Sequence, residues 1–292
     1  MRSILLLLLA TLVCAGQSTD AAAEKPAVPP LPPGVQVEAN IAYDHYPQTV
    51  LDVFTPASDS SGTKRCGVLM IHGGGWVNLT KESVVEKFVF PWLKQGCVVA
   101  NVEYRLAAVA PAPAAVEDVL KAAKWFSDNS KKYDVDKNHI VATGGSAGGH
   151  LALMVGLASK SARLGPTGNV GAIVNFYGIT DVEDQLGGPN MRKYAVTWVP
   201  EAEGRMELAR RVSPISYVRK DVPPVLTLHG TADQTVPYEH GVRITKELRA
   251  AGADAEMISV ANARHGFTPE EMAKVWPQIF DFLRRRDILR AR

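Results

Sequence analysis

The stretch IVATGGSAGGHLALM (residues 140–154) places four glycines around one serine, between a β-branched run and a helix-forming run. Glycine destabilises the interior of regular structure, so such a cluster indicates a sharp turn or a close approach of the backbone. Residues Gly144 to Gly148 fit the pattern G-x-S-x-G, in which a serine occupies a strained turn between strand and helix. Side chains two residues before or after the serine would collide there. The stretch therefore predicts Ser146 as a nucleophile at a helix N-terminus, where partial positive charge favours a developing anion.

A phosphate-binding loop is the alternative for so many glycines. The stretch lacks the lysine of a Walker motif and the spacing of G-x-G-x-x-G. The nucleophile interpretation is therefore preferred.

The hydrophobic pattern around this turn alternates between the two periods of strands and helices. Such alternation predicts an α/β fold: one mainly parallel, twisted sheet of about eight strands with helices on both faces. A polar, partly helical insertion at about 181–213 interrupts it and is expected to form a small cap over the strand ends. We expect strands over 35–43, 49–54, 68–72, 98–104, 139–143, 171–177, 225–229 and 256–260, and helices over 82–95, 114–129, 147–157, 238–250 and 271–289, with Pro277 interrupting the last.

Catalytic groups in such sheets collect at the carboxyl ends of the strands. A serine hydroxyl needs a base, and with this type of turn the expected chain order is serine, acid, histidine. Only His265 follows the last strand in a loop beside a glycine, so it is the predicted base. His72 is expected to order the glycine loop, His150 to pack on its helix, and His229 to be structural.

The acid that orients the base is predicted to be Asp233, in the loop after the strand 225–229. Asp254 is nearer to His265 in sequence, but it lies in a turn at the amino end of the sheet and would face the wrong side. Asp181, after the strand 171–177, is the second candidate.

The glycine run HGGGW (72–76) follows an earlier strand at the same edge. Backbone N–H groups can stabilise the oxyanion that forms when a carbonyl is attacked, and glycines let the substrate approach them. The predicted oxyanion hole consists of the N–H groups of Gly74, Gly75 and Ala147. An ordinary glycine-rich turn is the alternative.

The N-terminal 23 residues have a basic start and a short apolar run, which is typical of a secretory signal peptide and too short to span a membrane. A lipoprotein anchor on Cys14 is a weaker alternative. A Pro-rich tether is predicted over 24–34 and a single catalytic domain over 35–292. Export to the periplasm or medium would permit a disulfide between Cys66 and Cys97, which each precede an apolar run; two buried thiols are the alternative.

The composition limits the class of partner. The 292 residues carry a formal net charge of +2, with 46% hydrophobic and 21% charged residues. So small a charge gives no reason to expect nucleic acid or a membrane surface as partner. No cluster of cysteine and histidine indicates a metal, and the predicted chemistry needs no cofactor. The oligomeric state is not determined by the sequence.

The motifs HGGGW, YRLA, GGSAGGHLA, HGTADQTVP and RHGF occur in this order. The chain from about 35 to 288 resembles the α/β-hydrolase esterases of the hormone-sensitive-lipase-like group, and especially the bacterial BD-FAE-type feruloyl and acetyl esterases. The resemblance implies a Ser-His-Asp triad of Ser146, His265 and Asp233, with the HGGG loop as oxyanion hole. It also implies an ion pair between Arg105 and Asp118 as scaffolding.

The predicted function is that of a secreted serine carboxylesterase acting on short-chain or aromatic acyl esters, for example acetyl or feruloyl esters of plant polysaccharide. Trp76, Tyr177 and Trp198 are the predicted pocket walls, although each could equally be core. Alternatives are a polyester hydrolase, a general carboxylesterase or lipase, an arylformamidase-like amidase, a prolyl-oligopeptidase-type peptidase and a binding module without catalysis. The missing propeller domain argues against the peptidase.

Overall fold

The structure is a computed structural model that describes residues 29–57, 64–167 and 169–290. The predicted signal peptide (1–23) and residues 24–28 of the predicted tether lie outside these ranges. Residues 29–34 of the tether contain no helix or strand. No helix in the described ranges is long and apolar enough to cross a bilayer.

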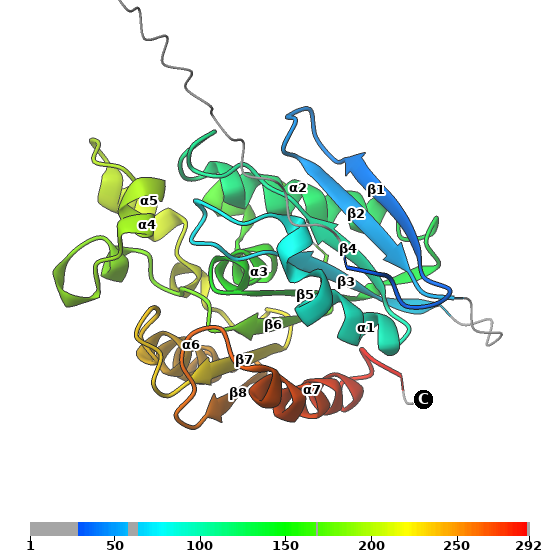
Figure 1. Ribbon diagram of the computed structural model, residues 1–292. Helices are drawn as coiled ribbons and strands as arrows, with labels where there is room; N and C mark the ends of the chain where they lie inside the picture. Colours follow the sequence, from blue (N-terminus) through cyan, green and yellow to red (C-terminus); the bar gives the residue numbers. More distant parts are fainter. Residues whose placement is uncertain (1–28, 58–63, 168, 291–292) are drawn as a thin grey trace, which may run out of the picture.

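A single eight-stranded sheet forms the centre of the molecule (Figure 1). Its order is β1-β2-β4-β3-β5-β6-β7-β8; the pairs β1–β2 and β2–β4 are antiparallel and the others are parallel. The predicted mainly parallel sheet is thus confirmed. The strands are β1 (Gln36–Ala42), β2 (Val50–Thr55), β3 (Arg65–Ile71), β4 (Val98–Val102), β5 (Val135–Gly145), β6 (Ala172–Phe176), β7 (Val225–Gly230) and β8 (Ala255–Val260).

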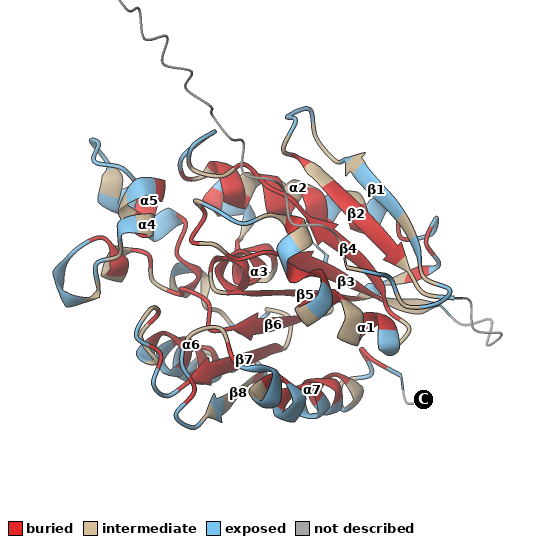
Figure 2. Ribbon diagram, in the orientation of Figure 1, coloured by how far each residue is buried: buried red, intermediate tan, exposed pale blue. Residues whose placement is uncertain are grey.

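Successive side chains of a strand point to opposite faces of the sheet. In the central strands successive residues are buried, whereas the edge strand β1 is largely exposed (Figure 2). In β3, Leu69 and Ile71 join one apolar core, whereas Val68 and Met70 join the other. A strand covered on both sides needs a continuous apolar run, which is why these segments are not half polar.

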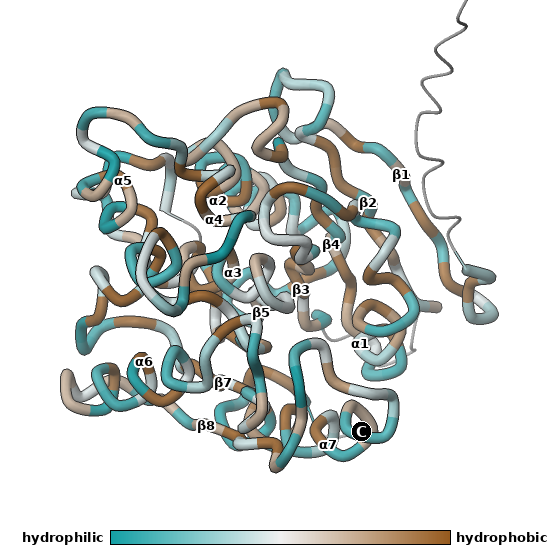
Figure 3. Tube along the Cα trace, turned by 60° about the vertical axis from the view of Figure 1, so that its left-hand side comes forward, coloured by the Kyte–Doolittle hydropathy of each residue, from teal (hydrophilic) through white to brown (hydrophobic). Residues whose placement is uncertain are grey.

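The helices divide between the two faces. Buried residues of α2 (Ala114–Asp128), α3 (Ala147–Leu157) and α6 (Glu239–Ala250) belong to the first core, and those of α1 (Phe90–Lys94) and α7 (Pro269–Arg284) to the second. Along α6 and α7 the hydropathy alternates between the two extremes (Figure 3), as expected for helices that pack one face on a sheet. The described chain is therefore one three-layer α/β unit.

The prediction of one continuous α-helix over 82–95 is wrong. Its place is taken by a 3₁₀ turn η1 (Lys81–Val84), a π-helical turn η2 (Val85–Val89) and the short α1. Pro91 has no N–H and cannot donate the bond that a continuous α-helix would direct to the carbonyl of Lys87. The last helix, in contrast, continues through Pro277 and ends at Arg284, before the predicted end.

The predicted insertion (181–213) holds short helices beyond the carboxyl end of β6 (Figure 1). They are connected by loops that lead back to β7 through η6 (Pro214–Tyr217). The elements are η4 (Glu183–Gln185), η5 (Gly188–Asn190), α4 (Lys193–Trp198) and α5 (Arg205–Arg211).

The site is positioned by the connections of β3 and β5. These strands are neighbours, but the chain leaves β3 toward α1 on one face and leaves β5 toward α3 on the other. Such a switch point leaves a crevice at the carboxyl ends of the two strands, where open α/β sheets bind their ligands.

Cys66 and Cys97 are joined by a disulfide, which is the first of the two alternatives that the sequence left open. It ties the first residues of β3 to the start of β4, across a sequence separation of 31. Closing a loop of this length removes conformational entropy from the unfolded chain.

We expect replacement of both cysteines by alanine to lower the free energy of unfolding by about 3–4 kcal/mol, as expected for a loop of this length. Urea unfolding of the oxidised protein and the double variant measures the difference. An unchanged midpoint would contradict a stabilising role for the bond.

Candidate active site

Ser146 lies at a strained turn between β5 and α3, with φ 59° and ψ −123°. A Cβ on Gly144 would lie 2.3 Å from the carbonyl oxygen of Ile71, and one on Gly148 would lie 2.1 Å from the same oxygen. No other residue fits at either position without moving β3. The glycines of the G-x-S-x-G pattern are therefore required because the turn lies directly against the neighbouring strand.

The hydrogen bonds of the turn are made by the backbone of Ser146 and not by its hydroxyl. The backbone N–H of Ser146 donates to the carbonyl of Phe176 (2.9 Å) and its own carbonyl accepts from His150 N (3.0 Å). Its side chain makes no capping bond at the start of α3. Ser146 is the N-cap residue of α3, so a negative charge that develops on its side chain lies near a helix N-terminus, whose positive partial charge stabilises an anion.

His265 and Asp233 form a hydrogen-bonded pair: Nδ1 of His265 lies 2.8 Å from Oδ2 of Asp233. The other oxygen, Oδ1, accepts from the backbone N–H groups of Thr235 (2.9 Å) and Val236 (3.0 Å). Burial of this carboxylate favours its neutral form. The hydrogen bonds from His229, His265 and Val236 outweigh that effect and hold the pKa of Asp233 well below its usual range. The ionised carboxylate fixes Nδ1 of His265 as donor, which leaves its Nε2 lone pair free.

His229 touches Asp233 as well, a contact that the sequence analysis did not anticipate. Its Nε2 lies 3.0 Å from the carbonyl oxygen of Val236 and 3.3 Å from Oδ2 of Asp233. Its Nδ1 is buried and has no partner among the described residues. An N–H on Nε2 donates to the carbonyl of Val236 and lies beside the carboxylate of Asp233. The structural role predicted for His229 therefore includes support of the acid, for which the spacing of four residues was the available signal.

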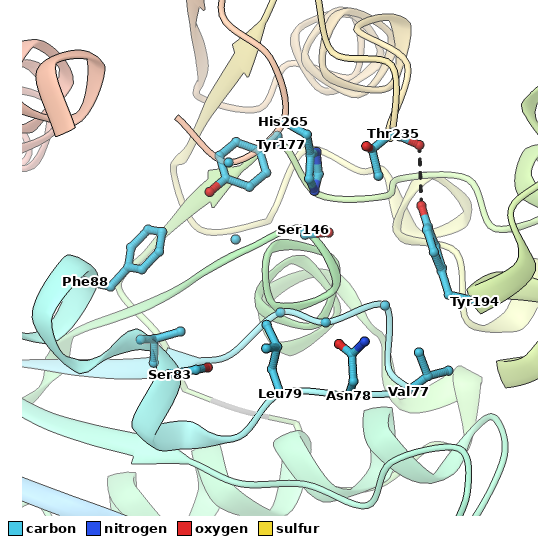
Figure 4. Close-up of a pocket in the computed structure, with 16 residues that line it drawn as sticks. Val77, Asn78, Leu79, Ser83, Phe88, Ser146, Tyr177, Tyr194, Thr235 and His265 are labelled. Atoms are coloured by element: carbon cyan, nitrogen blue, oxygen red, sulfur yellow. Dashed lines mark hydrogen bonds between the residues drawn. The ribbon is translucent and has the colours of Figure 1, made fainter. Parts of the chain in front are cut away.

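Ser146 and His265 line the same pocket, which has a volume of about 400 Å³. In Figure 4 the imidazole of His265 points toward Ser146 from the loop after β8, on the side opposite the glycine loop. The structure thus brings together the three predicted residues from three loops that are far apart in sequence. Asp181 and Asp254 form ion pairs elsewhere, with Arg243 and Arg286 respectively.

The glycine loop follows β3 and lines the same pocket. Gly74 (φ 94°) and Gly75 (φ 59°) have left-handed backbone conformations. The carbonyl of Gly74 accepts from the N–H groups of Val77 and Asn78 (both 3.1 Å). Among the described residues, the backbone N–H groups of Gly74, Gly75 and Ala147 donate to no backbone carbonyl. Donors without a partner at a pocket wall suit a developing oxyanion.

His72 orders the glycine loop through a hydrogen bond, as predicted. Its Nδ1 lies 2.9 Å from the carbonyl oxygen of Gly73, and its Nε2 lies 3.0 Å from Oε1 of Glu103. The ring stacks on Tyr104 at a centroid distance of 4.2 Å. The pair of Arg105 and Asp118 is also confirmed, with Nη2 to Oδ1 at 2.7 Å.

The prediction that Trp76 and Trp198 form pocket walls is wrong. Both side chains are fully buried and stack on each other at 4.1 Å. Nε1–H of Trp76 donates to Nδ1 of His150 (3.2 Å), whose Nε2–H donates to the carbonyl of Val212 (2.7 Å). The two rings face inward because this buried chain of contacts joins the glycine loop, helix α3 and the insertion. His150 is a packed helix residue, as predicted.

Tyr177 lines the pocket as predicted, and its ring contacts that of His265 at a centroid distance of 4.8 Å. Tyr194 of α4 also lines it, one helical turn before Trp198. Burial raises the pKa of Tyr194 to about 12, although a hydrogen bond from its hydroxyl to Gln185 opposes the shift. The predicted pocket residue of the insertion therefore lies on the right helix, but the aromatic residue in the wall is Tyr194 and not Trp198. Wall residues that were not predicted are Val77, Asn78, Leu79, Ser83, Val84, Phe88 and Thr235.

The BD-FAE family profile matches residues 51–248, which include Ser146, the glycine loop and Asp233. The chain belongs to the BD-FAE family. Among curated relatives of this BD-FAE chain, Esterase LipC of Mycobacterium tuberculosis is 29% identical over 250 residues, covering 81% of this chain and 61% of LipC. Esterase LipQ of the same organism is 27% identical, covering 75% of this chain and 54% of LipQ. The BD-FAE chain thus spans little more than half the length of these relatives.

Solved structures share the fold. A truncated carbohydrate esterase from gut microbiota superposes with a TM-score of 0.74 at 26% identity, covering 85% of this chain and 96% of that one. Thermogutta terrifontis esterase 2 phosphorylated by paraoxon gives a TM-score of 0.74 at 22% identity, covering 92% of this chain and 100% of that one. The fold of the BD-FAE chain is therefore that of α/β-hydrolase esterases.

We predict that His150 makes the protein sensitive to mild acid. Burial lowers the pKa of His150 to about 4, although its bond to the carbonyl of Val212 opposes the shift. The unfolded chain binds a proton near pH 6.5 and the folded chain does not, so stability falls as pH drops from about 6.5 to about 4, by roughly 3 kcal/mol in all. His150→Gln keeps an acceptor for Trp76 and a donor for Val212 but does not titrate.

Urea unfolding at pH 7 and at about pH 4.5 tests this, because the groups common to both proteins contribute equally. The wild type should lose about 2–3 kcal/mol more than His150→Gln between the two values. An equal loss in both proteins would contradict the assignment.

Proposed function

We propose that this protein is an exported serine carboxylesterase that cleaves uncharged esters with short or aromatic acyl groups. The observation that carries the proposal is the pocket that Ser146 and His265 share, with Asp233 holding the far side of the imidazole. The esterase relatives and the carbohydrate esterase structure support the reaction class.

The proposed mechanism has two steps of acyl transfer. In the first, Nε2 of His265 takes the proton of Ser146 as Oγ attacks the ester carbonyl. The oxyanion is stabilised by the N–H groups of Gly74, Gly75 and Ala147. The imidazolium then gives its proton to the leaving alcohol, and an acyl-enzyme remains. In the second step, water attacks the acyl-enzyme with the same base, and the acid and the free serine are released.

Asp233 contributes by staying ionised throughout the cycle. Its low pKa means that it holds the imidazole in one tautomer and stabilises the imidazolium without taking the proton itself. Activity should therefore not depend on protonation of this carboxylate at any pH near neutrality.

The substrate class is inferred from the pocket wall. None of the residues that line the pocket is an aspartate, glutamate, lysine or arginine. A charged ester would lose its hydration there without gaining a partner, so a neutral ester is favoured. Leu79, Val84 and Phe88 supply apolar area for an acyl chain or ring, and the volume of about 400 Å³ limits the length. Acetyl or feruloyl esters of plant polysaccharide fit this description; a polyester chain is the alternative.

The disulfide between Cys66 and Cys97 supports the proposed export, because such bonds persist in oxidising compartments. The predicted signal peptide lies outside the described residues, and secretion or periplasmic residence is part of the proposal. Comparison of the protein in medium, periplasm and cytoplasm of its host tests it.

Replacement of Ser146 by alanine should abolish turnover and preserve the fold, because among the described residues Oγ makes no capping bond to α3. We expect kcat for p-nitrophenyl acetate to fall about 10⁴-fold or more, with an unchanged circular dichroism spectrum. Labelling by a fluorophosphonate probe should be lost in the same variant. Near-normal turnover or labelling would remove Ser146 from the mechanism.

The acyl preference can be measured with p-nitrophenyl esters from acetate to laurate, together with methyl ferulate and acetylated xylan. We expect kcat/KM to be highest for short acyl chains or for ferulate and to decrease toward laurate, because the pocket is limited in volume. A maximum at laurate would contradict the substrate class and leave the mechanism intact.

A further inference from the structure

A lysine from a distant part of the chain reaches the loop that carries His265. Lys87 lies in the π-helical turn η2, and its Nζ donates hydrogen bonds to the carbonyl oxygens of Gly266 and Phe267 (2.8 Å for Phe267). These two residues directly follow His265. The contact therefore connects two segments that are about 180 residues apart in sequence. It does so directly beside His265, the proposed base.

The loop after His265 needs such a contact because its backbone is strained and because no other atoms of the described residues pack where a side chain at Gly266 would lie. Gly266 and Phe267 both have left-handed conformations, with φ 97° and 37°. A Cβ built on Gly266 would meet nothing within 4 Å, so the glycine serves the backbone conformation and not a tight fit. A left-handed conformation at a bulky residue such as Phe267 persists only where surrounding contacts enforce it.

The turn that carries Lys87 is itself unusual. A π-helical turn inserts an extra residue into a helix and is frequently found at functional sites. Here it directs Phe88 into the pocket wall, while Lys87, its neighbour, reaches the His265 loop. Lys87 is half-buried, and burial lowers its pKa, against the attraction of Glu271 at the start of α7. One short element thus touches both the substrate pocket and the base loop.

We propose that Lys87 is a positioning residue that holds the imidazole of His265 in line with Ser146 and with the leaving alcohol. The proposal rests on the role of His265 in the proposed function. Asp233 fixes the imidazole through Nδ1, and Phe267 packs on Tyr177, whose ring also touches His265. Lys87 adds the third constraint, because it fixes the backbone on the C-terminal side of the histidine.

The two proton transfers of the acylation step make this role measurable. The imidazole takes the proton of Ser146 and must then deliver it to the leaving oxygen, so that the C–O bond breaks as an alcohol departs. An alkoxide leaving group requires this proton, whereas p-nitrophenolate departs without one. A misplaced imidazole therefore slows acylation by an alkyl ester more than acylation by a p-nitrophenyl ester with the same acyl group.

The experiment compares Lys87→Met, which keeps the aliphatic stem, with Lys87→Arg, which restores donors for the two carbonyls. Lys124→Met is the matched control, since Lys124 is exposed on α2 and pairs with Asp128. The values of kcat/KM for ethyl butyrate and p-nitrophenyl butyrate are measured for each. Thermal unfolding establishes that each variant is folded, and Lys87→Gln replaces Lys87→Met if the latter is not.

We expect Lys87→Met to lose about 10²-fold in kcat/KM for the ethyl ester and about tenfold or less for the p-nitrophenyl ester, the scale of a displaced catalytic group. Lys87→Arg should recover most of the loss, and Lys124→Met should equal wild type. An unchanged kcat/KM, or equal losses for both esters, would overturn the inference. If the wild type itself shows no turnover that depends on Ser146, the proposed function is wrong and this inference falls with it.

Discussion

The carbonyl oxygen of Ile71, at the end of β3, lies so close to the turn around Ser146 that the chain has no room for a side chain on either flank. This contact between neighbouring strands is the constraint on which the site depends. It forces glycine at 144 and 148, and Ser146 itself takes a conformation that L-residues rarely adopt. The strain at Ser146 persists because β5, which ends just before it, is paired with the buried strands β3 and β6 on its two sides. Among the described residues, the hydroxyl of Ser146 makes no capping bond at the start of α3.

The second requirement is that loops from other strands meet this hydroxyl with little freedom. Buried polar contacts, and not packing alone, fix the conformation of these loops. Trp76, His150 and Val212 form a hydrogen-bonded chain that joins the glycine loop to the insertion. The carboxylate of Asp233 accepts hydrogen bonds from two backbone N–H groups and from His265, and Nε2 of His229 lies 3.3 Å from its Oδ2. Such networks are costly when only half satisfied, and they specify one arrangement when they are complete.

The sequence predicted those parts of the site that the backbone dictates locally. The glycine pattern around Ser146, the chain order of the triad and the exclusion of Asp254 need only the strand order and the rule that loops gather at the carboxyl edge. It failed where tertiary packing chooses among similar side chains. Tyr194 and Trp198 lie one turn apart on α4, and both contact Trp76. Trp198 is the one that stacks on Trp76 and is buried, whereas Tyr194 lines the pocket. The π-helical turn that carries Lys87 was missed for a related reason. The apolar spacing of 82–95 fits an ordinary helix, and Pro91 interrupts it. The segment also makes contacts far along the chain, from Lys87 to the loop after β8 and from Trp92 to α7.

The most direct measurement is a crystal structure of the protein after reaction with an organophosphonate that carries a good leaving group. The account requires phosphorus bonded to Oγ of Ser146, its oxygen within hydrogen-bond distance of the N–H groups of Gly74, Gly75 and Ala147, and Nε2 of His265 beside the adduct. An adduct on another residue, or an imidazole turned away from Ser146 in the adduct, would contradict the claim that these separate loops converge on one hydroxyl.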